Sequence, residues 1–411
     1  MTLLTSTEGQ TGLPRYFKPV FAQASRMGYG RLDVVLPDGR RFRATGAKPG
    51  KVAEVLVHND DALARLVREG ELGFAEAYMD GWWSTPDLQA LMDVIFRDNP
   101  ALLDEFTGIG LVRVYEKLRH WLRGNSRAQA RKNIAQHYDI GNDFYSLWLD
   151  DSMTYSSALF RTGQESLERA QEQKYAALVD SLALRPGDHV LEIGCGWGGF
   201  AEYAALQRGL RVTALTISQA QHDFAVARME RAGLADRVQI KLQDYRDETG
   251  VYDAIASIEM FEAVGEAYWP AYFTTLRERL KAGARATVQV ITVPNERFAL
   301  YRRNVDFIQK YIFPGGMLIS PGRFGDEARR AGLTWHEAIT FGDSYSQTLR
   351  RWHDRFQAAW PRIQALRQPG TAMAAYDARF RRMWEFYLTS CAGAFHTGIC
   401  DVTQITLRRP V

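Results

Sequence analysis

The sequence predicts an α/β protein in which a Rossmann-like, doubly wound parallel sheet follows a small α+β N-terminal domain. Three observations support this prediction. Strand-like and helical stretches alternate from about residue 180 onward, a glycine-rich turn follows the first of these strands, and the first 120 residues have a different pattern. Such alternation is typical of parallel sheets with crossover helices. We therefore expect two domains, 1–120 and 121–411.

The N-terminal domain begins with a predicted hairpin. Residues 30–46 alternate apolar and polar side chains around the turn sequence PDG, which is typical of two antiparallel strands. Residues 60–83 and 85–99 have apolar side chains at helical spacing. A few strands and helices in that order predict a small α+β domain.

Five β-rich segments form the predicted sheet of the second domain. They are residues 188–195, 210–218, 237–245, 252–260 and 284–293. In such a sheet the ligand binds beyond the carboxyl ends of the strands, where the strand order reverses. The glycine-rich turn, VLEIGCGWGGF at 190–200, follows the first strand. We therefore expect this turn to hold a ligand.

Composition narrows the class of protein. With 411 residues, 46% of them apolar, the chain is long enough for one large or two ordinary globular domains. A net charge of +3 is too weak to indicate nucleic-acid binding. The cysteines are three in number and unpatterned, which favours a reducing, cytoplasmic compartment. No apolar run of about 18 residues occurs, so we expect any membrane contact to be peripheral.

The junction between the predicted domains is basic. Residues 117–133 hold six Lys or Arg and no acidic residue. Two interpretations stay open. The stretch is a solvated linker, or it is a surface that anionic lipid headgroups attract.

The glycine turn alone does not identify its ligand, because nicotinamide, flavin and S-adenosylmethionine (SAM) sites all use one. A nicotinamide site expects an acid about 20 residues on, at the end of the second strand. That strand end reads LTIS, followed by Gln221, and has no acid. Glu192 before the glycines and LQDYRD at 242–247 suit SAM better, because acids can bind its ammonium and adenine edge. A glycine turn without any ligand is the alternative.

Longer motifs make the chain resemble the cyclopropane-fatty-acyl-phospholipid synthase family. They are QHYDIGNDFYSLWLDDSMTYSSALF at 136–160, EMFEAVG at 259–265, KYIFPGG at 310–316 and YLTSCAGAFHTG at 387–398. The N-terminal EGELGFAEAYMDGWW is similar to that of the long bacterial members. The resemblance implies a class I SAM-dependent methyltransferase that modifies the double bond of an unsaturated acyl chain in a membrane phospholipid.

The resemblance also implies a lipid- or membrane-associated domain at 1–120 and an acyl-chain pocket within the catalytic domain, 121–411. It implies a location at the inner face of the membrane, and it suggests a homodimer. Positions that match the family's SAM site, together with Glu192, are Tyr155, Ser156, Gly194, Gly196, Thr216, Gln221, Gln243 and Asp244.

Cyclopropane synthases are understood to use a bicarbonate ion as the base that takes the last proton. The family holds this ion with a Cys, a Glu, a His, an Ile backbone group and a Tyr. Glu262, Ile291 and Tyr345 match three of these positions, whereas Ser157 stands in place of the Cys and Gln289 in place of the His. Neither Ser nor Gln can carry positive charge. We therefore expect bicarbonate to bind weakly or not at all.

A second carboxylate, Glu259, precedes Glu262 by three residues, where the family segment does not require an acid. One hypothesis is that Glu259 takes over the role of the base. The product is then a methyl-branched alkene or a methylene group, as in pathways to branched or furan fatty acids. The other hypothesis is that the altered site still gives a cyclopropane. Both products stay open at this point.

Aromatic faces can stabilise the carbocation that methyl transfer creates. The candidates are Tyr138, Phe261, Tyr311, Phe313, Tyr345 and Phe395. We expect His137 to be a structural or pocket-wall residue rather than a catalytic base, Cys195 to pack in the turn, and no metal site. A methyltransferase for a small soluble molecule and a non-catalytic SAM- or lipid-binding protein are the alternative functions.

Overall fold

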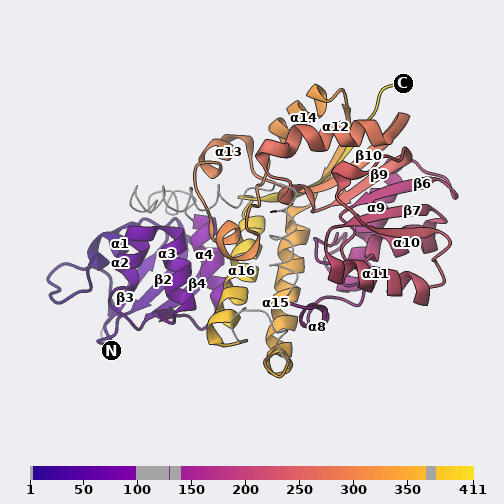
Figure 1. Cartoon of the computed structure of the whole chain (residues 1–411). Coiled ribbons are helices and arrows are strands. Elements are labelled where there is room, and N and C mark those ends of the chain that lie inside the picture. The colour runs from indigo at the N-terminus through magenta and orange to yellow at the C-terminus, as the bar shows by residue number, and fades with distance from the viewer. Residues whose placement is uncertain (1–2, 99–128, 130–139, 367–375) are drawn as a thin grey trace. The chain divides into compact units, whose positions relative to one another are not determined.

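The computed structural model describes residues 3–98, 129, 140–366 and 376–411 and divides the chain into two compact units (Figure 1). The first unit comprises Met1–Arg119, Asn304–Ile312 and Ala372–Ile399, and the second comprises His120–Arg303, Phe313–Thr371 and Cys400–Val411. Two late segments thus join the first unit, which the sequence pattern did not indicate. Apart from Gln129, the basic stretch 117–133 lies outside the described residues, as do His137 and Tyr138.

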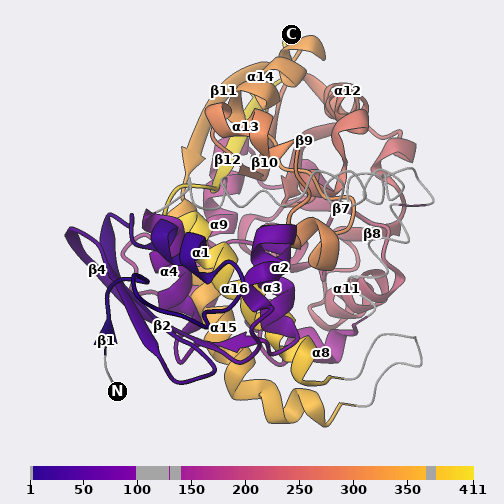
Figure 2. The same cartoon turned by 90° about the vertical axis from the view of Figure 1, so that its left-hand side faces the viewer.

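The first unit contains a five-stranded sheet. Its order is β1 (Leu3–Leu4), β3 (Arg41–Thr45), β2 (Tyr29–Val35), β4 (Lys48–Val57) and β5 (Trp83–Ser84) (Figure 2). The strands β2 and β3 pair antiparallel with Val35 opposite Arg41, as the hairpin prediction requires. Gly39 makes the turn with a φ of +86°, in the left-handed region that glycine adopts without strain.

Helices of the first unit come from both ends of the chain. They are α1 (Phe17–Ala24), α2 (Ala62–Glu69), α3 (Glu71–Met79), α4 (Leu88–Asp98), α16 (Ala378–His396) and a short π-helix, η4 (Ile308–Ile312). The helical stretch expected within 60–83 consists of two helices, because Gly70 between them has a φ of +66°. Along α16, buried residues such as Phe386 and Leu388 pack into the unit.

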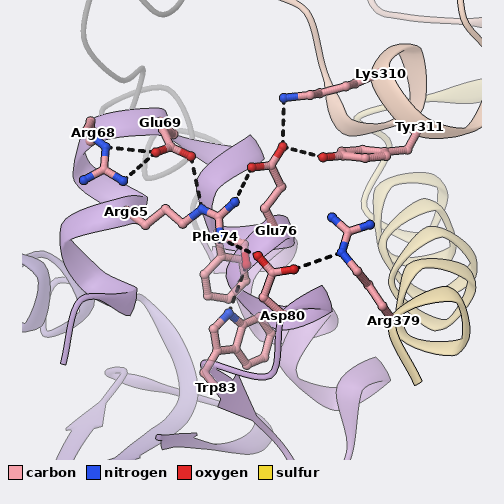
Figure 3. A network of polar contacts seen from close by, with 10 residues as sticks. All are labelled: Arg65, Arg68, Glu69, Phe74, Glu76, Asp80, Trp83, Lys310, Tyr311 and Arg379. Atoms are coloured by element: carbon pink, nitrogen blue, oxygen red, sulfur yellow. Dashed lines mark hydrogen bonds and ion pairs between the residues drawn. The ribbon is translucent and has the colours of Figure 1, made fainter. Parts of the chain in front are cut away.

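A network of charged side chains ties α2, α3, η4 and α16 together (Figure 3). Glu76 of α3 accepts a hydrogen bond from the Tyr311 hydroxyl at 2.6 Å and lies 2.8 Å from Lys310 Nζ. Asp80 binds Arg65 at 2.7 Å and Arg379 at 2.9 Å. These partners are far apart in the sequence, so the network explains why 304–312 and α16 belong to this unit.

The second unit is built on a seven-stranded sheet, ordered β11-β12-β10-β9-β6-β7-β8. The bounds are β6 (His189–Ile193), β7 (Arg211–Thr216), β8 (Val238–Leu242), β9 (Tyr252–Ile258), β10 (Leu280–Thr292), β11 (Thr334–Thr340) and β12 (Asp401–Arg408). The strands β6 to β10 coincide with the five predicted segments and are parallel, which confirms the α/β prediction. The strand β12 returns antiparallel to β10.

Helices cover both faces of this sheet. One buried cluster joins the sheet to α12 (Trp269–Arg279) and α14 (Pro321–Arg330), and another joins it to α9 (Leu167–Leu182) and α10 (Gly199–Arg208). The remaining elements are α8 (Asn142–Ser146), α11 (Gln219–Arg231), α13 (Asn295–Tyr301), α15 (Gly342–Gln364), η1 (Tyr245–Asp247), η2 (Phe261–Ala263) and η3 (Glu266–Tyr268). This is the doubly wound arrangement that the sequence predicts. Within the described residues, no helix combines the length and apolarity needed to cross a bilayer.

Candidate active site

The predicted site residues of the second unit gather at the carboxyl ends of the parallel strands. The strands β7 and β8 extend from one side of β6, and β9 and β10 from the other, so the strand order reverses between β6 and β9. Ligands of open α/β sheets bind at such a reversal. The glycine turn follows β6, and Glu259 and Glu262 follow β9.

The glycine turn has a conformation that only glycine tolerates. Gly194 has a φ of +85°, and a Cβ atom there would lie 2.6 Å from Met260 Cγ. The amides of Gly194 and Cys195 both donate to the Leu215 carbonyl, at 3.0 and 2.8 Å, which fixes the turn to the end of β7. The Cys195 thiol is buried, and burial raises its pKa well above the ordinary value. It is therefore a packing residue rather than a nucleophile.

Glu192, at the end of β6, presents an unpaired oxygen. The residue is 2% exposed, and its Oε2 has no hydrogen-bond partner among the described residues. Burial raises the pKa of Glu192 to about 8, although the charges of Lys174 and Arg228 oppose this shift. A buried acceptor without a donor calls for a ligand group. The ammonium group of SAM would supply this oxygen with a hydrogen-bond donor and a positive charge.

Two further predicted cofactor residues lie at the end of β7 and the start of α11. The Thr216 hydroxyl donates to Gln221 Oε1 at 3.0 Å, and both side chains are buried. Ser218 accepts from the Gln221 amide and caps α11. These bonds hold both residues at the strand edge that carries Glu192.

The loop after β8 holds two more predicted cofactor residues, Gln243 and Asp244. Asp244 is 3% exposed and receives two hydrogen bonds from the Arg246 guanidinium, at 2.6 and 2.8 Å. Gln243 Nε2 donates to Glu248 Oε2 at 3.2 Å. The loop is thus ordered by its own charges, and it lies beside the end of β7 because the Gln243 amide donates to the Thr216 carbonyl.

Lys174 of α9 is a site residue that the sequence reasoning missed. Its side chain is completely buried, and Nζ donates to Ser156 Oγ at 2.7 Å. Burial lowers the pKa of Lys174 to about 7, against the opposing influence of Glu259, Asp150 and Glu192. Helical lysines are usually exposed, so only the fold could reveal this one.

The Glu259 carboxylate receives hydrogen bonds from three donors. The Ser157 amide and Gln289 Nε2 donate to Oε1, at 2.8 and 2.7 Å, and the Tyr345 hydroxyl donates to Oε2 at 2.6 Å. Burial raises the pKa of Glu259, whereas Tyr345, Lys174, Gln289 and Ser157 lower it. Glu259 has a φ of +48°, which is rare for a residue other than glycine. The carboxylate is thus held in place by several contacts.

These donors come from three of the five positions that the resemblance assigns to bicarbonate. Ser157 contributes its backbone amide, because its hydroxyl donates to the Ala158 carbonyl at 2.9 Å. The fourth and fifth positions, Glu262 and Ile291, contact each other, with the Ile291 amide 2.6 Å from Glu262 Oε1. Glu262 Oε2 is buried and has no partner among the described residues. Burial and the charge of Glu259 raise the pKa of Glu262 to about 8.

Some of the aromatic candidates lie near this site. The Tyr155 ring centroid lies 5.3 Å from that of Trp352 and 6.2 Å from that of Phe313. The Tyr345 ring is 6.3 Å from Trp352 and nearly perpendicular to it. Trp352 was not among the candidates, because its place on α15 becomes apparent only in the fold.

The other aromatic candidates have different roles. Phe261 is completely buried and packs against Trp269 and Tyr272, so it belongs to the core and not to a pocket wall. Tyr311 and Phe395 belong to the first unit, where Tyr311 binds Glu76.

Comparison with known proteins places these features in a family. The model of the mycolic acid cyclopropane synthetase family matches residues 125–405. The chain is 38% identical over 398 residues to the tuberculostearic acid methyltransferase of Mycobacterium tuberculosis, covering 92% of this chain and 88% of that protein. It is 36% identical over 370 residues to the cyclopropane-fatty-acyl-phospholipid synthase of Escherichia coli, covering 87% and 88%.

A solved structure supports the same relationship. The mycolic acid cyclopropane synthase CmaA1, complexed with SAH and CTAB, superposes with a TM-score of 0.62 and 29% sequence identity. The match covers 68% of this chain and 98% of that chain. SAH is the product that SAM becomes when its methyl group leaves, so the comparison agrees with the glycine turn and the unpaired Glu192 oxygen.

Proposed function

Because this chain belongs to the mycolic acid cyclopropane synthetase family, we propose that it methylates the double bond of an unsaturated lipid acyl chain and leaves a methyl-branched or methylene product. Membership of the family establishes the general activity: the chain is a SAM-dependent methyltransferase that acts on lipid acyl chains. The fate of the last proton, and with it the structure of the product, belongs to the proposal.

The residues at the carboxyl ends of the strands provide the proposed cofactor contacts. Glu192 Oε2 accepts a hydrogen bond from the ammonium group of SAM, so that this buried oxygen has a donor. The turn at Gly194 and Gly196 borders the rest of the amino acid moiety, as do Tyr155 and Ser156. Thr216 and Gln221, with Gln243 and Asp244, border the nucleoside. When bound, SAM supplies an electrophilic methyl group.

Methyl transfer requires the residues of the site to orient a weak nucleophile. An alkene must lie in line with the sulfonium methyl, and a dry, apolar wall holds it there. The new C–C bond uses the π electrons, the S–CH₃ bond breaks with its electrons on sulfur, and the other alkene carbon becomes cationic. The rings of Tyr155, Phe313 and Trp352 can stabilise this cation without capturing it.

Glu259 is the group best placed to take the proton that must then leave. Its carboxylate receives the three donors described above, which fix its oxygens and partly offset the rise in pKa that burial causes. Ionised, it also stabilises the cation through space, because the site has a low dielectric. Proton loss from the chain carbon beside the cation gives a methyl-branched alkene. A hydride shift from the methylated carbon, followed by proton loss from the new methyl group, gives a methylene group.

The observation that supports this product most is the position of the Glu259 carboxylate. It uses Ser157, Gln289 and Tyr345, which the resemblance assigned to bicarbonate, and so competes with that ion for its donors. The similarity to the tuberculostearic acid methyltransferase also supports a branched product. A cyclopropane is the second candidate, because Glu262, Ile291 and Tyr345 match the family's base site.

Proton NMR of the lipid product distinguishes the two outcomes. The protein is incubated with SAM and vesicles of a monounsaturated phospholipid. Vinyl signals together with a new branch-methyl signal, or exocyclic methylene signals, support the proposal, and the far-upfield signals of a ring methylene support the second candidate. Mass alone does not separate them, because both products gain one CH₂.

We also propose that the chain reaches its substrate from the surface of a membrane. The support is compositional: the six basic residues of 117–133 would attract anionic headgroups. Location at the inner face of the membrane and a homodimer are further expectations from the resemblance.

A further inference from the structure

We propose that Gln404 is a positioning residue for the base: it holds the Gln289 side chain with its N–H groups directed at Glu259. The inference rests on the proposed role of Glu259. Gln404 lies on β12, directly opposite Gln289 on β10, and both side chains are at most 2% exposed. The sequence reasoning did not single out Gln404, because its partners lie 115 and 230 positions away.

The hydrogen bonds fix the direction of both amides. Gln289 Nε2 faces two acceptors, Glu259 Oε1 at 2.7 Å and the Ser157 carbonyl at 3.3 Å. The opposite orientation would place Gln289 Oε1 against both oxygens and is unfavourable. Gln289 Oε1 must therefore point away from Glu259, and there it accepts from Gln404 Nε2 at 3.1 Å.

The acceptors around the Gln404 amide orient it in the same way. Its Nε2 faces the Gln289 side-chain oxygen and the Lys174 carbonyl, each at 3.1 Å, and an amide nitrogen has two hydrogens to share between them. Gln404 Oε1 is buried with no hydrogen-bond partner among the described residues. A buried, unpaired oxygen is costly. The present direction of the Gln404 amide is nevertheless favoured, because the reverse one would place Oε1 against two acceptor oxygens.

The consequence is a one-way chain of donors that ends at the base. It begins at Gln404 Nε2, which donates to both the Lys174 carbonyl and Gln289 Oε1, and it continues with Gln289 Nε2, which donates to Glu259. Without the Gln404 donor, Gln289 Oε1 is left buried with no hydrogen-bond donor, and the Gln289 amide is held less firmly in this orientation. Its hydrogen bond to ionised Glu259 then weakens, so the pKa of Glu259 rises.

The test is the pH dependence of kcat/KM in Gln404→Met, which keeps the size of the side chain and removes its donor. The matched control is Thr406→Val. Thr406 and Thr287 are the next inward-facing pair on the same two strands, equally buried and bonded at 3.0 Å, but they do not contact Glu259. We expect the acidic limb of Gln404→Met to move to higher pH by about one unit, which is a roughly tenfold loss of kcat/KM at any pH well down that limb. The limb of Thr406→Val should stay at the wild-type position, and thermal unfolding and SAH binding establish that both variants are folded.

If Gln404→Met does not fold, Gln404→Asn withdraws the amide by one methylene and is expected to give the same shift. A wild-type acidic limb in a folded Met or Asn variant would overturn the inference, and so would an equal shift in Thr406→Val. The product and the bicarbonate dependence of the wild-type protein are measured beside the variants. If the wild type requires bicarbonate, the proposed base is wrong. If the wild type does not require it and the limb does not move, only the role of Gln404 is wrong.

Discussion

The Tyr345 hydroxyl donates to Glu259 Oε2 at 2.6 Å, while the other oxygen of the same carboxylate receives the Ser157 amide and Gln289. Both oxygens are therefore engaged, and the anion is the form that these donors favour. Burial acts in the opposite direction and outweighs these donors, so the pKa of Glu259 is raised above its ordinary value. A raised pKa makes the carboxylate a stronger base toward a carbocation, which is a very strong acid.

Replacing the carboxylate by an amide should remove the base. We expect Glu259→Gln to lower kcat on the order of a hundredfold or more, because general bases contribute that much. SAH affinity should change little, since the proposed ammonium contact is Glu192. Methyl transfer to vesicles of a monounsaturated phospholipid measures the first effect, and titration with SAH measures the second.

The matched control is Glu327→Gln. Glu327 is also a buried carboxylate of the second unit, but its partners are Arg323 and Arg330 on α14. Comparable activity in Glu259→Gln and Glu327→Gln would be incompatible with Glu259 as the base.

Cofactor binding should release a proton from Glu192. Burial raises the pKa of Glu192 to about 8, so the free protein holds this proton at neutral pH. A cationic ammonium beside Oε2 favours the anion, and the proton leaves as the ligand binds. Calorimetric titration with SAH in two buffers of different ionisation enthalpy should therefore give different apparent enthalpies. In Glu192→Gln this part of the difference should vanish; a buffer dependence identical to that of the wild type would exclude the assignment.

The stability of the protein should fall as the pH rises through the titration of Glu262. Its pKa is about 8 in the folded chain, compared with an ordinary value of 4.5. Between these values the folded state binds the proton more tightly than the unfolded state, so the free energy of unfolding decreases with pH. The contribution is on the order of a few kcal/mol.

Urea denaturation between pH 5 and about pH 8 measures this slope. We expect Glu262→Gln to make the slope shallower, since Glu192, whose pKa is also about 8, keeps its own share of it. Glu172→Gln, a change at an exposed position of α9, should leave the slope as in the wild type. Parallel slopes for Glu262→Gln and the wild type would show that Glu262 does not carry the proton.

Salt should weaken binding to anionic vesicles if residues 117–133 contact the membrane. Screening shortens the range of charge attraction to about 8 Å at physiological ionic strength and further at higher salt. Co-sedimentation with vesicles across a salt series measures the effect, and vesicles of zwitterionic lipid are the control. Binding that does not change with salt would refute the electrostatic contact.

Strand positions were predictable because β6 to β10 each contain a β-rich segment, with helix-favouring segments between most of them. The strand β11 was not predicted, because all seven of its residues are exposed and no apolar face marks it. The sequence also did not predict that residues 304–312 and α16 belong to the first unit, because this depends on contacts between distant residues, such as that of Tyr311 with Glu76.

Within the site, the sequence indicated the carboxylates but not their surroundings. The extra acid at 259 was visible as a departure from the family pattern, and the fold adds its three donors. Lys174 and Gln404 carried no signal, because a lysine in a helix and a glutamine in a strand are ordinary residues. The assignment of individual residues to SAM stays a prediction.

The most direct test of the account is the bicarbonate dependence of the wild type beside that of Glu259→Gly. Glycine suits the φ of +48° at this position and leaves Ser157, Gln289 and Tyr345 without their carboxylate. We predict that the wild type is fully active in bicarbonate-free buffer and gains nothing from added bicarbonate, whereas Glu259→Gly is inactive until bicarbonate is supplied. A wild type that loses activity when bicarbonate is removed would contradict the central claim that Glu259 takes the place of that ion.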